Sequence, residues 1–110
     1  MKIINQTKHT TLAIECKIAV STADRLLGLL KKNQPPCLLF FTRWGIHTFF
    51  LKSPIDVLVL DRNHRIVKIA SRLRPYRFLF YNPLHKIVIE LPSGTINATN
   101  TALGDKILLA

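Results

Sequence analysis

Acidic residues are scarce in this chain. Its 110 residues include 6 Asp and Glu against 16 Lys and Arg, which gives a formal net charge of +10 at pH 7. A protein this basic attracts polyanions, because its electric field raises their concentration near the surface. The composition therefore predicts an anionic partner, such as nucleic acid, anionic lipid or an acidic protein.

Long apolar runs are also missing. The longest wholly apolar runs, such as residues 37–41, are far shorter than the ~20 residues that a membrane-spanning helix needs. Residues 1–8 contain no uninterrupted apolar segment, so we expect no cleavable secretion signal. These features predict a cytoplasmic protein without a transmembrane segment.

The chain has only two cysteines, Cys16 and Cys37, and no C-x-x-C pair. In a reducing compartment we expect them to be separate thiols, buried as small hydrophobic side chains. The four histidines are too dispersed along the sequence to indicate a zinc site. We therefore expect no metal and no cofactor.

Motifs for phosphate binding and nucleophilic catalysis are absent as well. The glycines stand apart at positions 28, 45, 94 and 104, so no phosphate-binding loop is formed. The sequence contains no G-x-S-x-G motif, and neither cysteine has an activating neighbour pattern. The sequence favours a binding or accessory protein over an enzyme.

What the chain does contain is apolar strand-like sequence. Hydrophobic residues make up 48% of it, which argues against disorder despite the high charge. The length suits one domain over residues 1–110. The apolar runs at residues 47–51 and 57–60 predict two paired inner strands. We expect the turn between them at Ser53 and Pro54, because proline has no amide hydrogen to donate within a strand ladder.

Further strands are expected at several places, and so are two helices. The predicted strands are 10–20, 38–42, 66–70, 86–91 and 106–109, and the predicted helices are 21–32 and 95–102. Many short strands with few helices indicate a mainly β (α+β) fold, either a small antiparallel β-barrel or a sandwich-like domain with one or two short helices.

Several short motifs occur in one order along nearly the whole chain. They are Arg25-Leu26-Leu27-Gly28-Leu29-Leu30, Ile46-His47-Thr48-Phe49, Ser53-Pro54-Ile55-Asp56-Val57, Leu60-Asp61, Leu73-Arg74-Pro75-Tyr76-Arg77, Ile89-Glu90-Leu91-Pro92-Ser93-Gly94 and Gly104-Asp105. In these motifs the chain resembles the family called domain of unknown function 192. The resemblance implies a small β-rich domain with minor helices and implies no reaction. Leu51 and Asn63-His64 depart from the family pattern, where Met and Asp-Gly are usual.

Four polar residues interrupt apolar strands and are the candidate catalytic residues: His47, Lys52, Asp56 and Glu90. If they converge, a His with a carboxylate partner could act as a general base, and the lysine could bind an anion. The alternative is structural. In that case the His would lie in the core, the Asp would fix the Ser-Pro turn and the Glu would pair with an Arg. Each would then satisfy the hydrogen bonds of buried polar groups.

A basic and aromatic segment covers residues 62–86, where no acidic residue occurs. Its candidate ligand-binding residues are Arg72, Arg74, Tyr76 and Arg77. Aromatic side chains interleaved with Arg could stack bases and grip a phosphate backbone. The alternative follows from the period of two in a strand: Tyr76, Phe78 and Phe80 would point inward, and the arginines would form a solvated face.

The sequence thus predicts a small binding or accessory module for an anionic partner, reached through residues 62–86. A second hypothesis is a small-ligand-binding or hydrolytic site around His47, Lys52 and Asp56.

Overall fold

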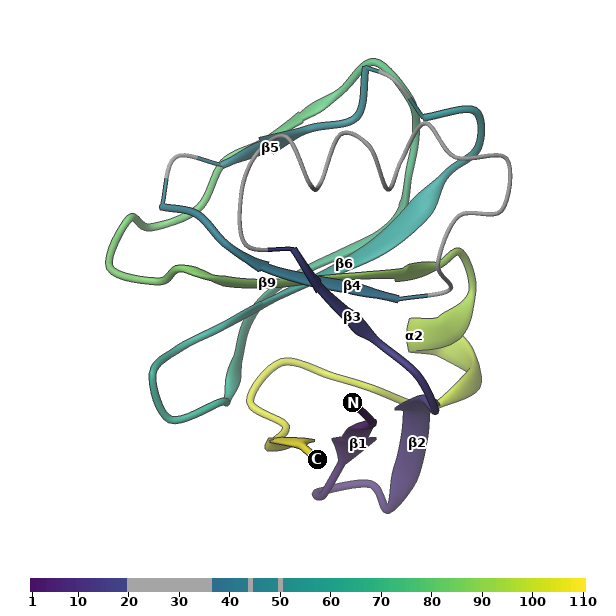
Figure 1. Ribbon diagram of the computed structural model, residues 1–110, viewed down its shortest axis with the longest axis vertical. Coiled ribbons are helices and arrows are strands. Elements are labelled where there is room, and N and C mark those ends of the chain that lie inside the picture. Colours follow the sequence, from purple (N-terminus) through teal and green to yellow (C-terminus); the bar gives the residue numbers. More distant parts are fainter. Residues whose placement is uncertain (20–36, 44, 50) are drawn as a thin grey trace.

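The computed structural model describes residues 1–19, 37–43, 45–49 and 51–110, which form three β-sheets and one short helix. A five-stranded sheet of order β3-β4-β9-β6-β7 crosses the middle of the molecule (Figure 1). The sheet β10-β1-β2 lies on one side of it, and the pair β5-β8 lies on the other. The predicted mainly β, sandwich-like fold is confirmed, whereas the three sheets do not close into the alternative barrel.

The elements are short, and most follow the expected segments. Their bounds are β1 Ile3–Asn5, β2 Thr10–Ala13, β3 Lys17–Ala19, β4 Leu38–Phe41, β5 Ile46–His47, β6 Ile55–Leu60, β7 Ile66–Leu73, β8 Phe78–Leu79, β9 Ile87–Pro92, α2 Thr95–Ala98 and β10 Ile107–Leu109. The strands expected at 38–42, 66–70, 86–91 and 106–109 are thereby confirmed. The helix expected at 21–32 lies outside the described residues. No helix among the described residues has the length and apolar character needed to cross a membrane.

Strand β6 is the inner strand on which the fold depends. It pairs antiparallel with β7 and with β9, and its residues 57–60 are all 0% exposed. Leu58 and Leu60 pack into one core with the three-stranded sheet, whereas Val57 and Val59 pack into a second core beneath β5 and β8. The prediction that residues 57–60 form an inner strand is confirmed. Both of its faces are covered, which explains the continuous apolar run.

The expected hairpin between residues 47–51 and 57–60 is wrong. Strand β5 pairs with β8, with Ile46 opposite Leu79, and both edges of β6 are occupied by longer strands. Beyond His47 the chain turns away from a ladder because Thr48 bonds to the loop before β8. The Thr48 hydroxyl donates to the Arg74 carbonyl at 2.6 Å and accepts from the Arg77 amide at 2.9 Å.

The single strand expected at 10–20 is also wrong. Strand β2 belongs to the three-stranded sheet and β3 to the five-stranded one. Strand β3 runs parallel to β4, with Lys17 opposite Leu38. The chain therefore changes sheets between the two strands, and Ile14 between them is left 76% exposed.

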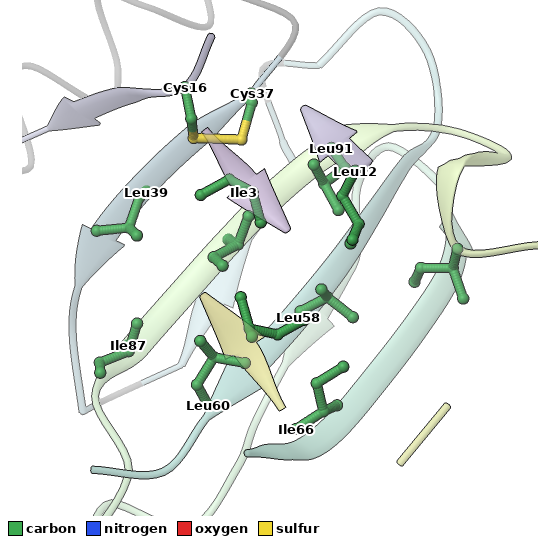
Figure 2. Packing of buried hydrophobic residues seen from close by; sticks show 13 residues of the cluster. Ile3, Leu12, Cys16, Cys37, Leu39, Leu58, Leu60, Ile66, Ile87 and Leu91 are labelled. Atoms are coloured by element: carbon green, nitrogen blue, oxygen red, sulfur yellow. A yellow bond between two sulfur atoms is a disulfide. The ribbon is translucent and has the colours of Figure 1, made fainter. Parts of the chain in front are cut away.

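The two cysteines form a disulfide, so the expectation of separate thiols is wrong, although their burial is confirmed. Cys16 and Cys37 directly precede the paired strands β3 and β4, and their Cα atoms lie 4.5 Å apart. Figure 2 shows the bond at the edge of the core that contains Ile3 and Leu39. Sequence spacing could not reveal this, because the residues are 21 positions apart and only the parallel pairing brings them together. Location in a reducing cytoplasm stays a prediction that a disulfide does not support.

Candidate functional site

The aromatic side chains at positions 76, 78 and 80, in and around β8, point outward. Tyr76, Phe78 and Phe80 are 71%, 58% and 66% exposed, whereas Leu79 between them is 9% exposed. Phe78, Leu79 and Phe80 therefore alternate with the expected period of two. Tyr76 lies in the turn before β8, where Arg77 is exposed as well. The inward orientation proposed for the rings is wrong. Leu79 faces the second core instead, where it belongs to one cluster with Val57 and Val59 of the five-stranded sheet.

These rings continue into a contiguous ring row, which we define as His47, Phe49, Tyr76, Phe78 and Phe80. Phe78 lies nearly parallel to Phe80, with ring centroids 5.7 Å apart. Phe49 meets Phe78 edge to face at 4.8 Å and stacks on His47 at 5.1 Å. Such spacings are typical of favourable aromatic pairs. The row joins side chains from both strands of the β5-β8 pair.

Local backbone geometry holds the ring row in place. Gly45 has a φ of +86°, and a Cβ atom there would lie 2.5 Å from the Leu79 carbonyl oxygen. Only glycine therefore lets the chain before β5 approach β8 this closely. Tyr76 has a φ of 61°, and its amide donates to the Thr48 carbonyl at 3.1 Å. The turn that presents Tyr76 is thus tied to the segment that carries Phe49.

Cationic side chains accompany the row. Arg74 and Arg77 are exposed and flank Tyr76 in the sequence. The Arg77 guanidinium donates to the Tyr76 carbonyl at 3.4 Å. The Lys68 ammonium on β7 donates to the Phe80 carbonyl at 2.6 Å, which places this charge beside the row. We call the ring row together with Lys68, Arg74 and Arg77 the basic aromatic face.

Carboxylates contribute little to the described surface. Asp56, Glu90 and Asp105 are 0%, 4% and 5% exposed, and Asp61 is half-buried. Burial raises the pKa of Asp61, but hydrogen bonds from the Arg65 and Asn63 amides, with nearby positive charges, lower it below 3.8 overall. Among the residues that the structure describes, Glu15 is the one fully exposed acidic side chain. Positive charge therefore dominates the surface formed by the described residues even more than the composition indicates.

Asp56, a candidate catalytic residue, has both carboxylate oxygens engaged by the backbone. Oδ1 accepts from the Arg72 amide at 2.8 Å, and Oδ2 accepts from the amides of Gly94 and Ile96 at 3.1 and 2.8 Å. The carboxylate ties β6 to β7 and to the beginning of α2. The alternative expectation was that Asp56 has a structural role and fixes the Ser-Pro turn. The side chain does bind backbone amides, but they belong to Arg72, Gly94 and Ile96 and not to the Ser-Pro turn.

The other three candidates occupy different settings. His47 is half-buried on β5 against Phe49, and Lys52 is exposed in the loop before β6. Glu90 is buried on β9, opposite Val57 and Leu38 in the two neighbouring strands. Their catalytic role stays a prediction.

A cavity of about 310 Å³ lies beside α2 and contains none of these four residues. It is lined by Ser71, Arg72, Ile96, Asn97, Asn100 and Thr101. Arg72 was selected from the sequence as a basic residue, whereas the asparagines were missed because no motif links them to β7. Among the described residues, no group of three or more His, Cys, Asp or Glu side chains could hold a metal ion.

The comparisons with known proteins identify the family. The chain matches the model of domain of unknown function 192, described as "Uncharacterized ACR", over residues 3–109, and it belongs to this family. It is 35% identical to a UPF0127 protein of Pyrococcus horikoshii, over 96% of each chain. It is 37% identical to a UPF0127 protein of Thermococcus sibiricus, over 96% of this chain and 72% of the relative.

Solved structures of lower identity share the fold. A protein of unknown function from Novosphingobium aromaticivorans superposes with a TM-score of 0.81 at 17% identity, over 98% of this chain and 84% of the other. A structure from Sinorhizobium meliloti gives a TM-score of 0.73 at 20% identity, over 97% and 89%. The resemblance to the family noted from the sequence is confirmed.

Proposed function

We propose that this chain is a binding module for an anionic partner, which it contacts through the basic aromatic face. The observation that carries the proposal is the outward orientation of Tyr76, Phe78 and Phe80 beside Arg74 and Arg77. Exposed rings cost hydration free energy in the unbound state, and a contiguous exposed apolar patch is typical of an interaction site.

The charge distribution supports an anionic partner over a neutral one. Three of the carboxylates in the described residues are buried within the fold, so they do not screen the face from an approaching polyanion. Clustered cations raise the association rate of such a partner and make binding sensitive to salt.

Chromatography on heparin at low ionic strength tests the proposal. We expect the protein to be retained and to elute as salt rises, because binding releases counterions from the polyanion and higher salt reduces the free-energy gain of that release. The double variant Arg74→Gln/Arg77→Gln should elute at lower salt than the unaltered chain. Lys2→Gln/Lys17→Gln is the matched control, since it removes the same charge from exposed residues away from the face.

Two results would contradict the proposal. Absence of retention at low salt would show that the chain has no affinity for polyanions. Equal shifts in the two double variants would show that net charge alone causes retention and that the face has no special part in it.

A further inference from the structure

Resting on the proposed function, we infer that the anionic partner is single-stranded nucleic acid, whose bases stack on the ring row. The row supplies an aromatic surface, and Lys68 and Arg77 supply positive charges next to it. Arg74 is exposed two positions before Tyr76. Stacking platforms flanked by cations are the means by which proteins bind single strands with little sequence preference.

The geometry of Phe78 and Phe80 suits successive bases. The two residues are separated by one position, so they share one face of an extended segment. Their rings are nearly parallel, with an interplanar angle of 10°, and both are more than half exposed. Every base has a π face, so a row of exposed rings can accept any base whose own stack is open.

A double helix does not suit this surface. Its bases are stacked on one another, so only the phosphates would be available to a ring row on the outside of a sheet. A duplex would gain the contacts to the cations and none to the rings. We therefore expect preference for single strands over duplex of equal charge.

An acidic peptide uses less of the face than a nucleic acid does. Its carboxylates would pair with Arg74 and Arg77, but it carries no regular series of flat groups. The exposed apolar side chains on this face are rings, at Phe49, Tyr76, Phe78 and Phe80. Flat rings stack on flat bases, whereas the aliphatic side chains of an acidic peptide have no flat face to stack on them.

The test compares four labelled or competing polyanions by fluorescence anisotropy at low salt. They are an oligothymidylate of about 12 nucleotides, a length within the usual range for such domains, an abasic deoxyribose-phosphate oligomer of the same length, a duplex, and poly-glutamate. We expect the oligothymidylate to bind about tenfold or more tightly than the abasic oligomer, because stacking of even one base has an effect of that size.

Variants separate the rings from the charges. Phe78→Ala and Phe80→Ala should remove most of the preference for thymidylate over the abasic oligomer, whereas Phe78→Tyr should keep it. Arg77→Gln should weaken the binding of both oligomers and make the salt slope shallower by about one. Leu103→Ala is the matched control, since Leu103 is 64% exposed but lies in the turn before β10. Circular dichroism checks that each variant is folded.

Each outcome decides between the two proposals. If the abasic oligomer or poly-glutamate binds as well as thymidylate while heparin retention persists, the inference is wrong and the proposed function stands. Binding of the duplex that is equal to or tighter than that of the oligothymidylate also overturns the inference. Loss of retention on every polyanion overturns both.

Discussion

Asn5 and Asp105 lie 100 positions apart in the sequence and are joined by a buried hydrogen bond of 2.9 Å from Asn5 Nδ2 to Asp105 Oδ2. Lys8 adds an ion pair to the same carboxylate at 3.0 Å, and the Ala102 amide donates to it as well. This carboxylate connects β1 and the turn after it to the turn that precedes β10.

The stability of the protein should decrease at acid pH partly through Asp105. Burial raises its pKa, but hydrogen bonds from Asn5, Lys8 and Ala102 and the charge of Lys8 outweigh this and lower it below 3.8. A lowered pKa contributes stability above the unfolded-state value, and this contribution is lost as pH falls through the folded-state pKa. Urea unfolding should therefore show less stability below about pH 4.

Asp105→Asn separates this contribution from that of other carboxylates. We expect a loss of about 2 kcal/mol at neutral pH, since a buried charged partner is removed, and a shallower decrease with acid. Some decrease should persist because the pKa of Asp61 is also lowered. An unchanged pH profile would contradict the role of Asp105.

Asp56→Asn should destabilise the fold strongly. The substitution keeps the shape of the side chain but leaves at most one oxygen for the three amides of Arg72, Gly94 and Ile96. We expect a loss of about 3 kcal/mol, because buried donors then lack acceptors. Asp61→Asn is the control, since that half-buried side chain accepts from two turn amides, and it should cost about 1 kcal/mol. Equal losses in urea unfolding would disprove this account.

The disulfide should be detectable and stabilising. Thiol titration of the unfolded, unreduced protein should find no free cysteine, because Cys16 and Cys37 are bonded. Cross-linking residues 21 positions apart should contribute about 3 kcal/mol by restricting the unfolded chain. The midpoint of urea unfolding should decrease with reductant, and Cys16→Ser/Cys37→Ser should show the lower midpoint with or without it. Two titratable thiols would refute the bond.

Gly45→Ala should destabilise the protein more than Gly104→Ala. Both glycines have φ near +87°, so both variants carry the conformational penalty of a side chain in the left-handed region. At Gly45 the new Cβ would also lie 2.5 Å from the Leu79 carbonyl oxygen, whereas nothing lies within 4 Å of it at Gly104. Thermal unfolding should show the difference, and the Gly45 variant should also separate β5 from β8 and weaken binding at the ring row. Similar midpoints would argue against the close contact.

Local pattern was sufficient to predict most strands of the fold but not their partners. The apolar run of β6 identified an inner strand, because burial on both faces leaves no alternation. The same run gave no information on whether β5 or β9 lies beside it. Partner choice depends on contacts between distant segments, such as Thr48 with Arg77, which no local period encodes.

The residues of the basic aromatic face were predictable only in part, and their orientation was not. Arg74, Tyr76 and Arg77 were candidates from the sequence, whereas the candidate Arg72 lines the cavity beside α2. Alternation placed Tyr76, Phe78 and Phe80 on one face of the segment, but the period alone does not tell which face meets the core. The structure shows that Leu79 packs into the second core, so the rings on the opposite face point outward. For Asp56, the sequence could identify a buried acid but not the three amides that surround it.

The position of β6 between two strands and two cores has a consequence for isotope exchange. Its backbone amides at Val57–Leu60 are shielded by β7 and β9 at the edges and by apolar side chains above and below. Solvent deuterium can reach such amides only when the whole assembly of sheets opens. Their exchange rate should thus report the global unfolding equilibrium of the molecule, and these amides should be the last to lose their protons.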